Sequence, residues 1–214
     1  MKKKILFVLG TAHCGSTLLS LILDSHPQCF NVGELSNFPS FYRSKKRICS
    51  VCESECVFWD RQFSQTELQN LCLGLANARI SPLIPLKVER FFRELVNDDI
   101  FRPYSAIASK TPANVIVDST KTIYWISGML QRKEIKKEFD IYLLHLVRDG
   151  RAVLNSYLKR KQTINVQDLS HLWLKRVTEN ERFFEKFSVG EKMLLRYEEF
   201  ATKPEEKTQK ICQI

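Results

Sequence analysis

A glycine-bounded loop constrains this chain more than any other feature of its sequence. The loop runs from Gly10 to Thr17, reads Gly-x4-Gly-Ser-Thr, and directly follows the apolar run Ile5–Leu9. This is the spacing of nucleotide-binding phosphate loops, in which glycines let the backbone N–H groups and a helix N-terminus face an anion. The chain holds only seven glycines, so finding two of them in this pattern predicts a strand, a phosphate-binding loop and a helix.

The loop lacks the lysine of the common nucleotide-binding motif, because Ser16 stands at that position. That lysine normally reaches the β- and γ-phosphates of a nucleoside triphosphate. The loop is therefore suited to a phosphate-like anion and poorly suited to hydrolysis of a magnesium-bound triphosphate. The alternative interpretation is an ordinary turn between a strand and a helix.

Short apolar stretches alternate with helical patterns along the rest of the chain. We expect strands at Lys4–Leu9, Cys29–Val32, Val115–Val117, Asp140–Val147 and Lys192–Arg196. We expect helices at Ser16–Asp24, Gln65–Arg79, Leu86–Asp98, Thr122–Lys137, Ala152–Lys161 and Asp168–Phe187, with a last one opened by Pro204. This alternation predicts an α/β fold: a P-loop-type, three-layer α/β/α arrangement around a parallel sheet.

We expect a single domain over residues 1–214, with an irregular, cysteine-containing insertion at about 37–63. A stretch without Lys, Arg, Asp or Glu, Ile5–Leu23, imitates a membrane segment, but its apolar part is short and its middle is polar. We therefore expect a soluble, cytoplasmic protein. Its net charge of +9 favours anionic partners without choosing among them.

Three of the seven cysteines form a C-x2-C-x3-C cluster, Cys49, Cys52 and Cys56. A structural zinc site requires four ligands, and no histidine lies nearby to supply the fourth. Metal binding, a redox-sensitive disulfide and plain thiols all remain open, and no residue is predicted as a metal ligand.

Four motifs in order resemble the sulfotransferases that use 3′-phosphoadenosine-5′-phosphosulfate (PAPS). They are His13-Cys14-Gly15-Ser16-Thr17, then Val117-Asp118-Ser119-Thr120-Lys121, then Arg148 with Ser156 eight residues later, and finally Arg196-Tyr197-Glu198-Glu199-Phe200 before Pro204. The resemblance implies transfer of a sulfuryl group from PAPS to a hydroxyl or amine of a carbohydrate, small molecule or peptide, without a metal. It implies that PAPS binds Gly10, Thr11, Ala12, His13, Cys14, Gly15, Ser16, Thr17, Arg148 and Ser156.

The resemblance also implies the catalytic residues. Glu34 would be the base, with His26 as its rival, and His13 and Lys121 would stabilise the leaving and transferring groups. The sequence departs from the family twice. His13 replaces the commoner Arg or Lys, and the chain stops at Ile214, before a segment that usually helps to enclose the nucleotide. We therefore expect either a short member or one lacking the C-terminal part of the family domain.

Two other functions stay open: a P-loop kinase or NTPase, and a non-catalytic binder of adenosine bisphosphate. No nucleic-acid-binding motif is present, and we expect neither a nucleic acid nor a membrane as partner. The expected partner is a small-molecule or carbohydrate acceptor, with Phe58, Trp59 and Trp125 as candidate walls of its pocket. The sequence does not predict the oligomeric state.

Overall fold

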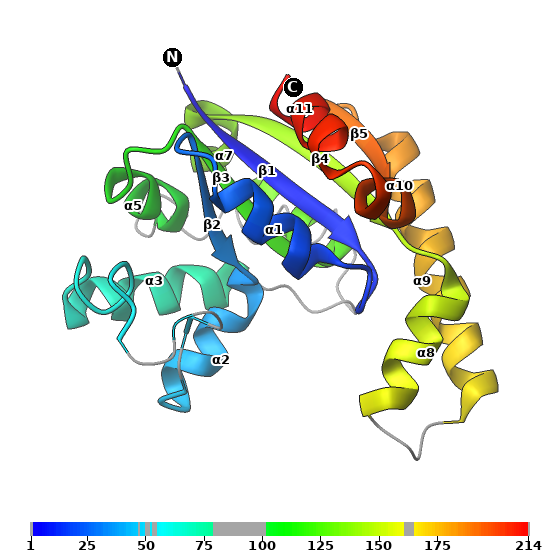
Figure 1. The fold of residues 1–214 in the computed structure, drawn as a ribbon. Coiled ribbons are helices and arrows are strands. Elements are labelled where there is room, and N and C mark those ends of the chain that lie inside the picture. Colours follow the sequence, from blue (N-terminus) through cyan, green and yellow to red (C-terminus); the bar gives the residue numbers. More distant parts are fainter. Residues whose placement is uncertain are drawn as a thin grey trace.

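The fold is built on a parallel sheet. The computed structural model describes residues 2–46, 48, 49, 52, 55–78, 102–160 and 165–213. Within these residues five strands pair in the order β2-β3-β1-β4-β5 (Figure 1). Their bounds are Lys3–Gly10 (β1), Cys29–Gly33 (β2), Val115–Lys121 (β3), Phe139–Val147 (β4) and Glu191–Arg196 (β5). All four pairings are parallel, so the carboxyl ends of the strands meet at one edge of the sheet.

The central strand shows why the sheet is covered on both faces. Ile5, Phe7 and Leu9 lie in one apolar cluster, whereas Leu6 and Val8 lie in the other. Successive side chains of a strand point to opposite faces. A strand that is apolar at every position therefore requires helices on both sides, as the sequence predicted.

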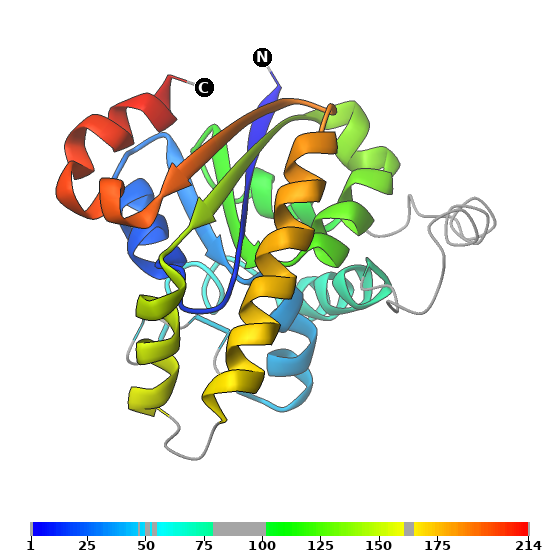
Figure 2. The ribbon, with the colours of Figure 1, turned by 90° about the vertical axis from the view of Figure 1, so that its right-hand side faces the viewer.

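Helices on the first face contribute to the larger cluster: α3 (Gln65–Ala78), α5 (Pro103–Ser109), α6 (Ile123–Gln131), α7 (Lys133–Glu138) and α9 (Val166–Lys186). On the second face lie α1 (Ser16–Asp24), α10 (Tyr197–Thr202) and α11 (Pro204–Cys212). The 3-10 turn η1 (Leu35–Asn37) and α2 (Phe38–Arg43) follow β2. Helix α8 (Gly150–Arg160) and the start of α9 extend beyond the carboxyl ends of the strands (Figure 2).

The fold class is confirmed, and several elements differ in detail. The segment expected to be irregular at 37–63 contains α2, and helices α5 and α10 were not predicted. The expected helix Leu86–Asp98 lies outside the described residues. The stretch Thr122–Lys137 forms two helices instead of one. The break lies at Arg132, whose backbone is extended and whose buried guanidinium donates to the Gly74 carbonyl (3.0 Å).

Strand β3 runs four residues further than predicted. Asp118, Ser119 and Thr120 are polar yet buried, and Lys121 pairs with Leu9 of β1 after a bulge. Their polarity hid the continuation of the strand. Lys121 is therefore the last residue of β3.

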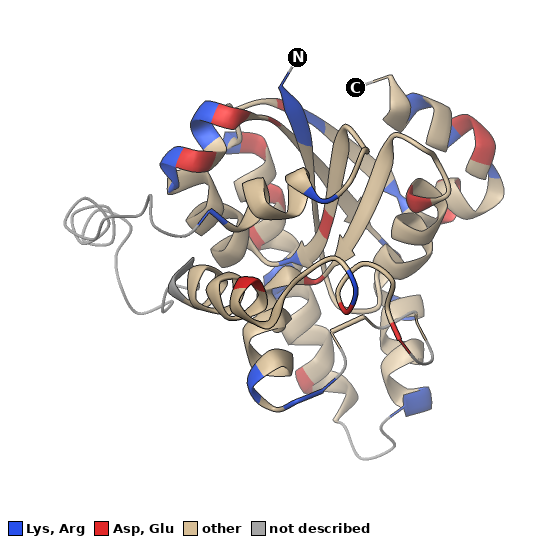
Figure 3. Ribbon diagram, turned by 90° about the vertical axis from the view of Figure 1, so that its left-hand side faces the viewer, with Lys and Arg blue, Asp and Glu red and all other residues tan. Residues whose placement is uncertain are grey.

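The remaining features of the fold concern a buried histidine and the charges of two helices. His145 of β4 is a packing residue: it is buried beside Phe184, and burial lowers its pKa to about 4, which keeps the imidazole neutral. Helices α7 and α11 each carry both Lys and Glu residues, so neither helix bears charges of a single sign (Figure 3). In the described residues, none of the helices has the length and apolar character to cross a bilayer.

Candidate active site

The glycine-bounded loop forms a curled cradle at the carboxyl end of β1. His13 (φ 62°) and Gly15 (φ 96°) both have left-handed backbone conformations, and Gly15 is the N-cap of α1. Ser16, the first residue of α1, is buried. The N-terminus of this helix therefore opens directly from the loop, where its unpaired N–H groups and partial positive charge attract an anion.

Arg148 and Ser156 reach the loop from the neighbouring strand. Gly10 of β1 pairs with Leu146 of β4, so the residue that follows β4 lies beside the loop. Arg148 Nη1 donates to the His13 carbonyl oxygen (2.9 Å), and Ser156 Oγ lies 3.0 Å from His13 Nδ1. The eight-residue spacing noted in the sequence thus brings both side chains to one loop residue.

Two aromatic rings to which the sequence analysis assigned no role complete this side of the site. The Arg148 guanidinium lies over the Tyr197 ring, 4.3 Å from its centroid, and the Tyr157 ring packs edge-on against His13. Arg148 Nε is buried without a hydrogen-bond partner. The guanidinium is therefore oriented but keeps an unsatisfied donor, which fits an anionic ligand.

Glu34 and Lys121 meet on the other side of the site, at the ends of β2 and β3. These strands are neighbours, and Lys121 Nζ forms an ion pair with Glu34 Oε1. Asn37 donates to the second carboxylate oxygen of Glu34 (3.0 Å). Lys121 has a left-handed backbone conformation (φ 71°), a strained state that β-strand residues rarely adopt. Backbone strain of this kind is concentrated at functional sites, so it supports a functional role for Lys121 and its partner Glu34.

The pKa of His13 shows that positive charges converge on the loop. Burial lowers it most, followed by the charges of Arg160, Arg148 and Lys121. The free protein therefore holds His13 neutral near pH 7. Arg160 was not predicted, although its place one helical turn after Ser156 was a readable signal. The site is electropositive before any ligand enters.

The buried carboxylate of Asp118 gathers several hydrogen bonds around the end of β3. Asp118 accepts hydrogen bonds from Tyr104 (2.6 Å), Trp125 (2.7 Å) and Thr120 (2.6 Å), and burial raises the pKa of Asp118. The Thr120 hydroxyl in turn accepts from the Ser36 N–H (3.3 Å), which ties β3 to the turn after Glu34. Trp125 is therefore part of the core and not a wall of the acceptor pocket.

An apolar pocket of about 430 Å³ opens beside Glu34. Besides Glu34, its lining includes the aromatic residues Phe30, Phe38, Phe41, Phe58 and Trp59. Phe58 and Trp59, which the sequence analysis named as candidate walls of an acceptor pocket, both line this pocket. A pocket of this size accommodates a small organic molecule.

His26, the rival base, and Arg151, which follows the Arg148 turn, both lie away from this site. His26 is at the opposite edge of the sheet, before β2, where its Nδ1 accepts from the Gln28 N–H (3.2 Å). Its position removes it as a rival to Glu34. Arg151 points into solvent and pairs with Asp149 (2.6 Å), so it does not contact the loop in this structure.

Comparisons with known proteins agree with this geometry. Residues 6–214 match the sulfotransferase family. The sulfotransferase domain from the curacin biosynthetic pathway has 16% sequence identity and a TM-score of 0.58, with 99% of this chain and 73% of that chain covered. The sulfotransferase domain of the Synechococcus PCC 7002 olefin synthase has 18% identity and a TM-score of 0.57, with 100% and 74% covered. No curated protein sequence is significantly similar to this chain.

Proposed function

The chain belongs to the sulfotransferase family, and from that premise we propose that it transfers a sulfuryl group from PAPS to the hydroxyl or amine of a small molecule. The observation that carries the proposal is the convergence of Arg148 and Ser156 on His13 of the phosphate loop, with Glu34 and Lys121 paired at neighbouring strand ends. An anion site and a carboxylate–ammonium pair thus meet at one edge of the sheet.

The residues of the loop fit the two phosphate groups of the donor. The backbone from Gly10 to Thr17 and the N-terminus of α1 would hold the 5′-phosphosulfate. Arg148, whose Nε has no partner, and Ser156 would hold the 3′-phosphate. PAPS supplies the sulfuryl group and, when bound, a phosphate leaving group. The Ser16 substitution weighs against a kinase or NTPase, because the lysine expected there is missing.

Glu34 and Lys121 would divide the chemistry of transfer between them. The Glu34 carboxylate takes the proton of the acceptor hydroxyl or amine as that atom bonds to sulfur. Lys121 offsets the negative charge of the sulfuryl oxygens, and His13 protonates or hydrogen-bonds the phosphate oxygen whose bond to sulfur breaks. The products are the sulfated acceptor and 3′,5′-adenosine bisphosphate.

The pocket beside Glu34 favours an acceptor with an apolar body. Five aromatic side chains line it, so most of its wall suits the apolar part of an acceptor, while Asp24, Asn31 and Asn37 supply polar groups besides Glu34. We therefore favour a small organic alcohol or amine over a carbohydrate or peptide, with its reactive group at Glu34 and its apolar part against Phe58 and Trp59.

Removing the Arg148 side chain tests the nucleotide half of the proposal. Arg148→Ala is expected to weaken binding of 3′,5′-adenosine bisphosphate by about tenfold or more, because a charge-assisted hydrogen bond contributes about 1.5–3 kcal/mol. AMP, which lacks the 3′-phosphate, should bind nearly as before. Isothermal titration calorimetry measures both, with the exposed Arg151→Ala as the matched control. Equal losses for the two nucleotides would overturn the placement of the 3′-phosphate.

Protonation of His13 gives a second test. His13 is neutral in the free protein, and bound phosphates raise its pKa, so nucleotide binding should take up protons. Affinity should then rise as the pH falls from about 8 to 6, by up to about tenfold per pH unit. Calorimetry in buffers of different ionisation enthalpy measures the uptake.

The matched control for this test is His13→Arg, whose charge is permanent. It should flatten the pH dependence and retain activity, whereas His13→Ala should lose turnover. The ligand's own phosphates titrate equally in both proteins, so only the difference counts. Identical proton uptake in wild type and His13→Arg would show that His13 does not become charged in the complex.

A further inference from the structure

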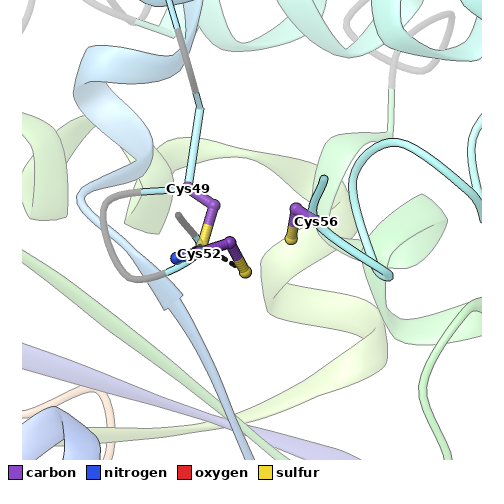
Figure 4. Close-up of side chains that lie close together, drawn as sticks. All are labelled: Cys49, Cys52 and Cys56. Carbon is purple, nitrogen blue, oxygen red and sulfur yellow. Dashed lines mark hydrogen bonds between the residues drawn. The ribbon is translucent and has the colours of Figure 1, made fainter. Parts of the chain in front are cut away.

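Among the described His, Cys, Asp and Glu side chains, one cluster of cysteines has the spacing of metal ligands. Cys49, Cys52 and Cys56 lie on the loop after α2, and Figure 4 shows their side chains around a common space. Their three sulfur atoms all lie within 4.8 Å of one another, and the Cys49 and Cys52 sulfurs are 3.3 Å apart. We propose that these three thiols bind one zinc ion.

The sulfur separations match a tetrahedral ion. A zinc–sulfur bond is about 2.3 Å long, so two thiolates of one tetrahedral zinc lie about 3.8 Å apart. The observed range of 3.3 to 4.8 Å brackets that value. A disulfide would require a separation of about 2.05 Å. A zinc ion can therefore enter the cluster with little movement of the loop.

The surrounding hydrogen bonds favour a thiolate at Cys49. The Cys52 N–H donates to Cys49 Sγ (3.4 Å), and hydrogen bonding to a charged group stabilises its charged form. When zinc binds, it replaces the three thiol protons, which are released to solvent.

The loop around Cys56 is held in place independently of an ion. The Cys56 N–H donates to Asp60 Oδ2 (2.7 Å), and Cys56 itself is buried. Phe58 and Trp59 follow directly and pack into the larger apolar cluster. A bound zinc ion would therefore link Cys49 and Cys52 to Cys56, whose position is already fixed by Asp60 and by the packing of the residues that follow.

Within the part of the chain that the structure describes, these three thiols are the only ligand atoms in the cluster, so the fourth position would be taken by water or by an occupant of the neighbouring pocket. The three cysteines are among the residues that line the pocket containing Glu34. The zinc site itself does not rest on the proposed function. An effect of bound zinc on acceptor binding, through the wall of the pocket, does rest on it.

Metal content and cobalt spectra test the proposal without measuring activity. The full chain, purified anaerobically, is expected to hold about one zinc per chain by mass spectrometry. After removal of zinc, added Co²⁺ should give the intense sulfur-to-cobalt charge-transfer absorption of a tetrahedral thiolate site. Cys49→Ser and Cys52→Ser should each weaken zinc binding by about 100-fold or more. Cys212→Ser, an exposed cysteine on α11, is the matched control and should change nothing.

Two results would overturn the zinc site. One is protein whose three thiols are reduced, titratable and indifferent to Co²⁺, and the other is a Cys49–Cys52 disulfide in the anaerobically purified chain. If one serine variant fails to fold, the zinc content and the cobalt spectra of the wild type are still enough to decide whether the zinc site exists. Binding of 3′,5′-adenosine bisphosphate should survive zinc removal. If the zinc-loaded protein failed to bind this nucleotide, that result would count against the proposed function and not against the zinc site.

Discussion

Glu34→Gln and Lys121→Met are each expected to lower sulfuryl-transfer turnover by about a thousandfold, while 3′,5′-adenosine bisphosphate still binds. A positioned base contributes about 10²–10⁴ in rate, and a cation aimed at developing charge contributes a similar amount. Neither side chain contacts Arg148 or Ser156, where the 3′-phosphate would bind. Steady-state kinetics with PAPS and a panel of alcohols and amines, together with calorimetry of the product nucleotide, separate the two effects.

A second ion pair supplies the control for this experiment. Lys110 pairs with Glu67 (2.9 Å), and neither residue lines the pocket, so Lys110→Met should leave turnover unchanged. Glu34→Asp keeps a carboxylate and should retain more activity than Glu34→Gln. Full turnover in both Glu34→Gln and Lys121→Met would remove this pair from catalysis. Absence of transfer by the wild type with intact nucleotide binding would instead support a non-catalytic binder of adenosine bisphosphate.

Gly15→Ala is expected to abolish measurable nucleotide binding and to destabilise the fold. A Cβ atom at Gly15 would lie 2.2 Å from Cδ2 of Tyr197, far inside contact distance, and φ of 96° is strained for any side chain. The ring would have to leave both the loop and the Arg148 guanidinium that lies over it. We expect nucleotide affinity to fall by more than about 100-fold, measured by calorimetry, with a lower unfolding temperature.

Gly33 separates the two causes of that loss. Its φ is also positive (71°), but a Cβ atom there would meet nothing within 4 Å. Gly33→Ala should therefore carry the backbone strain alone, about 1 kcal/mol, and should leave nucleotide affinity near that of the wild type. A Gly15→Ala variant that binds nucleotide as well as Gly33→Ala would show that Tyr197 is not needed in its present place.

The sequence predicted the sheet wherever a strand is apolar. Residues Ile5–Leu9 and the apolar part of β4 bury both faces, so their composition alone identified them. It failed where a strand is polar but buried, as at Asp118 and Thr120, because their hydrogen bonds to Tyr104, Trp125 and each other exist only in the folded chain. Helix α10 was missed because it is a short helix directly after β5.

The individual motifs of the candidate site could be predicted from the sequence, but not all of the contacts between them. The loop, Arg148 and Ser156 are separated by fixed spacings along the chain, and the parallel pairing of β1 with β4 then brings them together. Tyr197 could not be assigned a role in this way. Its contact with Gly15 depends on how α10 packs against α1, which no local pattern encodes. Likewise, the Glu34–Lys121 pair follows from the adjacency of β2 and β3.

The position of β1 in the middle of the sheet has a consequence for how a protein of this design changes over time. The nucleotide contacts proposed for Arg148 and Ser156 come from β4 and α8 on one flank, whereas Glu34 and the aromatic pocket lie beyond β3 on the other. Only the loop after β1 and Lys121 stand between them. If the two flanks bind acceptor and donor as proposed, mutations that change acceptor specificity on the β2 flank can accumulate without disturbing the donor side, so the two sides of the central strand can evolve separately.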